Sequence, residues 1–141
     1  MGQLYIDGDS TISIPAINTY FTINKWNDAG TWSYAENVTL TDSTITIGAT
    51  GYGYWNVSFS VSSTHSTSSS RANYTLFVND IEITGISARR KIGNGSDYGN
   101  MGLAAGKILL YPSDVLKLKT DSDNTGTVTI RKANFNIERI N

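Results

Sequence analysis

The residue types that most often do chemistry in proteins are scarce in this chain of 141 residues. It contains one histidine, His65, and no cysteine, so it can build neither a histidine-rich metal site nor a cysteine nucleophile. His65 lies in the segment STHSTSSS, among hydroxyl side chains. A Ser–His nucleophile would also need an orienting carboxylate and an oxyanion hole, and neither has a signature in the sequence. We therefore expect His65 to be a solvated loop residue.

Two further patterns of acidic residues are candidates for chemical sites. Residues 121–126, DSDNTG, resemble the opening of a calcium-binding loop, but the twelfth position, which needs a bidentate acid, is Lys132. We interpret this segment as a polar hairpin turn. Glycoside hydrolysis needs two carboxylates that are close in space, and the glutamates Glu36, Glu82 and Glu138 lie in strand-like or polar surface contexts. We therefore expect no bound metal, no cofactor and no enzymatic activity. If the protein were an enzyme, these carboxylates would fit a glycan hydrolase best.

The charged residues suggest a surface contact. Arg89, Arg90 and Lys91 adjoin a glycine-rich segment, where they could bind a carboxylate, a phosphate or an acidic partner surface. The alternative, which the sequence favours, is a solvated strand end that discourages edge-to-edge aggregation. The net charge of −1 argues against general nucleic-acid binding. The first ten residues carry no signal-peptide pattern, and no segment is apolar enough over a sufficient length to span a membrane.

The elements that must carry these residues are strands. Charged residues make up only 16% of the chain, and Ser, Thr, Asn and Gly fill the polar positions, which suits strands and turns. Residues 54–61 show the clearest period of two, with Trp55, Val57, Phe59 and Val61 on one side. Similar short segments are expected at 4–6, 12–14, 20–25, 38–40, 45–47, 74–78, 81–86, 102–110, 116–118, 128–130 and 135–137.

Turn signals separate these strands. They occur at residues 27–32, at Asp42-Ser43, at Asn79-Asp80 and at Pro112, while residues 62–71 and 93–100 read as exposed loops. The pattern predicts one all-β domain over residues 1–141, an antiparallel β-sandwich of the jelly-roll kind. Within it, residues 1–14 are a candidate N-terminal attachment segment.

Four stretches carry a resemblance to a known family. They are the alternating strand 51–59 that begins Gly-Tyr, the hairpin 77–80, the turn and strand 110–118, and the terminal strand 135–137. Together they resemble the tumour-necrosis-factor/C1q-like jelly roll over about two-thirds of the chain. This chain differs from the usual pattern at Asp80 and at Ser113, where the family commonly has glycine.

The resemblance implies a homotrimer in which one sheet faces a threefold axis. A sheet with aromatic residues on its second face must bury them against something, and we expect Tyr52, Tyr54, Phe77 and Tyr98 to form the trimer interface. A domain of this kind is similar to small bacteriophage virion proteins.

The resemblance thus implies a structural role on the external surface of a phage particle. We expect a trimeric capsid decoration protein that binds the major capsid protein or another virion protein, through residues 2–14 and the Arg89–Lys91 cluster. The alternative is a receptor-binding fibre or tail tip that recognises a host surface glycan through Trp26, Trp32 and Tyr98. No membrane or nucleic-acid partner is expected.

Overall fold

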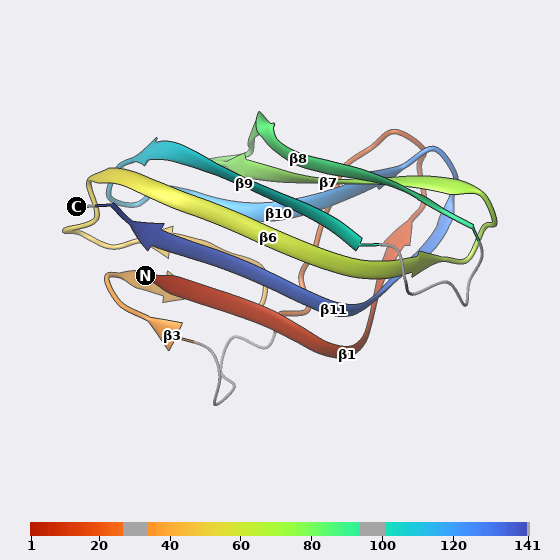
Figure 1. Cartoon of the computed structure of the whole chain (residues 1–141), viewed down its shortest axis with the longest axis horizontal. Helices are drawn as coiled ribbons and strands as arrows, with labels where there is room; N and C mark the ends of the chain where they lie inside the picture. The colour runs from red at the N-terminus through yellow and green to blue at the C-terminus, as the bar shows by residue number, and fades with distance from the viewer. Residues whose placement is uncertain (27–33, 94–100, 141) are drawn as a thin grey trace.

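The computed structural model describes residues 1–26, 34–93 and 101–140, and these form a sandwich of two antiparallel sheets (Figure 1). In these ranges there is no helix, so no described helix could cross a membrane. The five-stranded sheet has the order β3 (Tyr34–Ala35), β1 (Gly2–Ile14), β11 (Gly126–Arg139), β6 (Gly53–His65) and β9 (Met101–Leu110). The six-stranded sheet has the order β4 (Val38–Leu40), β5 (Ile45–Ile47), β10 (Val115–Ser122), β7 (Ser70–Val78) and β8 (Ile81–Ile92), with β2 (Phe21–Thr22) paired to β10.

The core lies between the sheets, and the alternation in β6 shows how the sequence builds it. Trp55, Val57, Phe59 and Val61 are buried, whereas the residues between them point away from the core. This confirms the predicted strand and its two faces. The apolar residues of the other sheet, including Leu76, Leu116 and Leu118, pack against these side chains in one core.

Glycines in β9 allow the two sheets to approach closely at one side of the sandwich. A Cβ on Gly102 would lie 2.8 Å from Cδ2 of Tyr74, and a Cβ on Gly106 would lie 2.6 Å from Cγ1 of Ile86. Tyr74 also joins the sheets through a hydrogen bond between its hydroxyl group and Ser63 Oγ. Residues 102–110 were predicted to be a strand, and these contacts explain why the strand contains glycine.

The predicted turns at Asn79-Asp80 and Pro112 are confirmed. Asn79 and Asp80 have φ values of 51° and 61°, and they join β7 to β8 in a two-residue hairpin. Ser113, which follows Pro112, has φ 72°. Asp80 and Ser113 are the two positions where the family commonly has glycine, and both adopt the left-handed conformation that glycine favours.

Three local predictions were wrong. The segments 4–6 and 12–14 form the single strand β1, which continues through an irregularity between Asp7 and Ser10 where Gly8 has φ +118°. β1 pairs with β11 along its length, so residues 2–14 belong to the five-stranded sheet, and their role in attachment stays a prediction. Residues 20–25 contribute only the short strand β2, and the predicted loop 62–71 shrinks to residues 66–69.

Candidate interaction surface

The outer surface of the five-stranded sheet, which we call the open face, carries mostly short polar and apolar side chains. At its centre Ser58 lies between Asn136 of β11 and Ala105 of β9, and Ser60 lies between Asn134 and Leu103. Short side chains lose little conformational entropy when they are buried. Charged side chains also lie on this face, for example in the ion pair between Lys132 Nζ of β11 and Asp7 Oδ1 of β1 at 2.7 Å.

Apolar side chains extend the open face along β9. Leu103 is 66% exposed, and Leu109 lies opposite Tyr54 of β6, which is 55% exposed. Sequence reasoning missed the two leucines. The signal was present in GLAAGKILL, because Gly102, Ala104 and Gly106 alternate with them and face the core.

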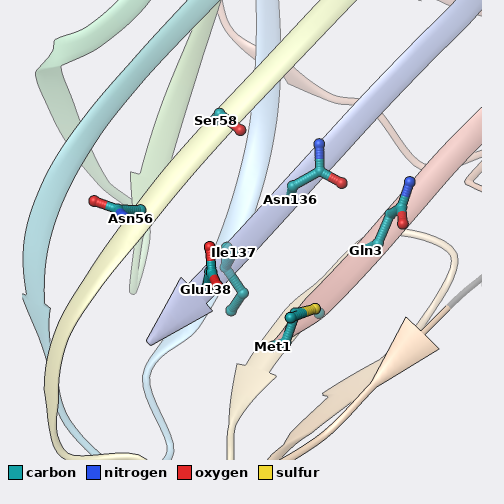
Figure 2. Close-up of a pocket in the computed structure, with 8 residues that line it drawn as sticks. Met1, Gln3, Asn56, Ser58, Asn136, Ile137 and Glu138 are labelled. Carbon is teal, nitrogen blue, oxygen red and sulfur yellow. The ribbon is translucent and has the colours of Figure 1, made fainter. Parts of the chain in front are cut away.

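A hollow of about 160 Å³ opens in this face where β1, β11 and β6 run side by side. Figure 2 shows Gln3, Asn56, Ser58 and Asn136 around it, with Glu138 between Asn56 and Met1. Donors and acceptors of amide and hydroxyl groups therefore line a depression in this face. Such a depression can receive a side chain from a second molecule.

The outer surface of the six-stranded sheet is different, because another part of the chain covers its aromatic residue, Phe77. The Tyr20 ring packs edge-on against Phe77 with ring centroids 5.0 Å apart, and its hydroxyl group lies 3.2 Å from Thr75 Oγ1 and 3.0 Å from Glu82 Oε1. Lys119 Nζ lies 4.5 Å above the Phe77 ring. Phe77 is therefore buried within this protomer and belongs to the other sheet.

The residues expected at a trimer interface are thus not brought together. Tyr54 projects from the open face, while Tyr52 lies just before β6 and contacts Tyr111. Phe77 is on the opposite side of the sandwich, under Tyr20, and Tyr98 lies outside the described residues. Of the tryptophans expected to bind glycans, Trp26 is buried against Phe135, so that expectation was wrong, and Trp32 lies outside the described residues.

The basic cluster lies in β8, at the edge of the six-stranded sheet. Arg89 Nε donates to Asn73 Oδ1 at 2.7 Å, and Asn73 in turn donates to Asp121, so Arg89 is held on the outer surface. Arg90 and Lys91 are also exposed, and they point to opposite sides because successive residues in a strand alternate. The cluster therefore places positive charge on both sides of a sheet edge, and its three side chains do not converge on one ligand.

His65 is buried, which corrects the prediction that it is solvated. Its backbone pairs with Val128 at the end of β6, and its Nδ1 accepts a hydrogen bond from the Thr67 N–H at 2.9 Å. Burial lowers the pKa of His65, although a backbone hydrogen bond with Asn124 and the charge of Asp123 act in the opposite direction. The hydroxyl-rich segment was predicted as a loop, but serine and threonine side chains also fit a pleated sheet, and here they continue β6.

The acidic turn 121–126 is not a hairpin, which corrects the prediction. β10 belongs to the six-stranded sheet and β11 to the five-stranded sheet, so residues 123–125 connect the two sheets. Asp121 accepts a hydrogen bond from Asn73, and Asp123 Oδ1 accepts one from the Arg71 N–H at 2.7 Å, so these carboxylates have protein partners. Within residues 1–26, 34–93 and 101–140, no group of three His, Asp or Glu side chains is placed to hold a metal ion.

The sheet order and the covered core define a jelly roll of the tumour-necrosis-factor type. The chain is similar to Eiger TNF from S. frugiperda, with 13% identity, a TM-score of 0.65, and coverage of 99% of this chain and 92% of that one. It is similar to murine APRIL, with 12% identity, a TM-score of 0.58 and coverage of 97% and 98%. It is also similar to vertex protein P5 of phage PRD1, with 15% identity, a TM-score of 0.61 and coverage of 99% and 96%.

At these identities the likeness shows the fold alone. No family model matches the chain, and no curated protein sequence matches it. The predicted all-β, antiparallel, TNF-like jelly roll is confirmed.

Proposed function

We propose that this protein is a structural component of a phage particle, a homotrimer that decorates the outside of the capsid and stabilises it. The likeness to the vertex protein of phage PRD1 supports a virion role, since it extends over nearly the whole of both chains. The lack of a metal-holding cluster in the described residues is consistent with a role in assembly.

The exposed apolar side chains of the open face are the observation that carries this proposal, because they favour self-association. The six-stranded sheet buries its outer aromatic residue under its own chain, whereas the five-stranded sheet leaves Leu103 and Tyr54 exposed. Exposed apolar groups beside short uncharged side chains match the core of a protein interface, where charged residues are depleted. A second and a third copy of the chain would remove this surface from water.

A charge placed at the centre of the open face tests this part of the proposal. We expect Ser60→Glu to convert the trimer to single chains, because a carboxylate would be buried in the interface without a partner. Thr84→Glu is the matched control, since Thr84 is exposed on β8 in the other sheet. If Ser60→Glu sediments like the unaltered trimer, the interface lies elsewhere.

Attachment to the particle is the second part of the proposal. Arg90 and Lys91 are exposed at the sheet edge, and we propose that they contact an acidic surface of the major capsid protein or another virion protein. Repeated weak contacts from a trimer would add through avidity. The exposed residues Asp7 to Asp9, at the irregularity of β1, offer a second attachment area.

The test uses phage particles that lack the protein because its coding sequence has been deleted. Purified protein added to them should bind to saturation, and the double variant Arg90→Glu/Lys91→Glu should bind more weakly while remaining a trimer. No saturable binding of the unaltered protein would refute decoration.

A further inference from the structure

Two exposed tyrosines lie side by side at one end of the sandwich. Tyr52, before β6, and Tyr111, after β9, are 55% and 52% exposed, and their ring centroids lie 5.3 Å apart with the planes inclined by 50°. Figure 1 shows that β6 begins and β9 ends at the same end of the molecule, where both chain termini also lie. The pair is therefore away from the centre of the open face.

Hydrogen bonds fix the two turns that carry these rings. The Gly51 N–H donates to Gly48 O at 3.0 Å, and Trp55 Nε1 donates to Gly51 O at 2.8 Å. The Tyr111 N–H donates to Asp114 Oδ2 at 2.8 Å. Rings that are held in place before a ligand arrives lose little freedom on binding, so this geometry favours recognition.

A polar cavity of about 260 Å³ adjoins this end of the molecule, and Arg139 connects it to the tyrosine pair. The cavity is lined by Glu36, Asn37, Glu138 and Arg139 together with Met1. The guanidinium group of Arg139 donates to the carbonyl oxygens of Thr50 and Tyr52. The same side chain thus lines the cavity and holds the backbone of Tyr52.

We propose that the Tyr52–Tyr111 pair and this cavity bind a neutral pyranose unit of an oligosaccharide. The C–H face of a sugar ring stacks on an aromatic ring, while its hydroxyl groups need both donors and acceptors, which Asn37, Glu138 and Arg139 supply. The opposite charges of Glu138 and Arg139 favour a neutral ligand over a charged one. The cavity is close to the ~300 Å³ lower end of small-molecule sites, which suits one or two sugar rings.

A protein partner fits this feature less well. Two half-exposed rings offer far less than the ~800 Å² that each side of a typical protein interface buries. The site goes beyond the structural role proposed above and does not depend on it, because capsid attachment was assigned to other residues.

The proposal is tested by saturation-transfer NMR and calorimetric titration of the full chain. The probes are the methyl glycosides of glucose, galactose and N-acetylglucosamine and their β-linked disaccharides. We expect saturable binding of at least one probe, weakened about tenfold by Tyr111→Ala and changed little by Tyr111→Phe, which keeps the stacking ring. Ile81→Ala is the matched control, since Ile81 is an exposed apolar side chain on β8 that lies outside both the tyrosine pair and the open face.

The absence of saturable binding by the unaltered protein would overturn the proposal, as would equal binding by Tyr111→Ala with its fold intact by circular dichroism. A loss of trimer in Tyr111→Ala without any sugar binding would assign the pair to self-association instead. Capsid binding measured on the same variants distinguishes these results from a failure of the decoration role, because we expect it to be unchanged.

Discussion

The hydrogen bond between Ser63 and Tyr74 offers a direct test of how the two sheets are stacked. Ser63 lies in β6 of one sheet and Tyr74 lies in β7 of the other, and both side chains are buried. Tyr74→Phe keeps the ring and removes its hydroxyl group, whereas Ser63→Ala removes the partner. The two variants thus break the same bond from opposite sheets.

The expected magnitudes follow from burial. Each single substitution leaves one buried hydroxyl group without its partner, which costs about 1–3 kcal/mol of unfolding free energy. The double variant removes both groups, so its loss should be close to that of one single variant rather than to the sum. We therefore expect a coupling energy of about 1 kcal/mol or more between the two positions.

The assay is urea unfolding of the wild type and the three variants, followed by circular dichroism and analysed as a double-mutant cycle. Thermal melting should give the same order, with roughly 4 °C for each kcal/mol in a domain of this size. Additive losses would mean that the two hydroxyl groups do not share a bond, and the stacking of β6 on β7 described above would be wrong.

The same tyrosine predicts a response to alkaline pH. Burial raises the pKa of Tyr74 to about 12 from its ordinary value of 10.0, because the folded state disfavours the phenolate. The stability associated with this group is fully present below pH 10 and is lost as the pH rises toward 12, by about 2–3 kcal/mol in all. Tyr74→Phe should therefore lose less stability than the wild type between pH 10 and pH 12.

Two other predictions concern stability. Gly106→Ala should lower the unfolding free energy by about 1–3 kcal/mol, because the new Cβ would lie 2.6 Å from Cγ1 of Ile86. Gly85→Ala is the control and should change the unfolding free energy little, since its Cβ would meet no atom within 4 Å. Equal urea midpoints for the two variants would contradict the close approach of β9 and β8. The pKa of His65 is lowered in the folded state, so the stability that the neutral ring contributes is present above about pH 6.5 and is lost as the pH falls. His65→Gln should therefore lose less unfolding free energy than the wild type between about pH 6.5 and pH 4.5 in urea titrations. Parallel pH profiles would show that His65 is not buried as a neutral ring.

Much of the fold follows from the sequence because one periodic signal repeats along the chain. The alternation at 54–61 places Trp55 and Phe59 in the core, and Asn79-Asp80 marks a hairpin by residue type alone. The exceptions have local causes. The segments 4–6 and 12–14 looked like two strands, but Gly8 lies at a bulge within one continuous strand. The hydroxyl-rich segment around His65 looked like a loop but pairs with β11.

The candidate surface was harder to predict because its members depend on distant parts of the chain. Phe77 alternates with core residues in β7, which correctly places it away from the core, but Tyr20 covers it from 57 positions away in the sequence. Trp26 is likewise buried against Phe135, at the other end of the chain. Local patterns indicate which side of a strand a residue faces, and only the tertiary structure shows what lies over that side.

The central claim is that the open face of the five-stranded sheet binds copies of the same chain. Sedimentation velocity of the purified protein at micromolar concentration tests it most directly. The account predicts one species of about 46 kDa, three times the 15.3 kDa of a single chain. A single species of 15.3 kDa across the whole concentration range would contradict it.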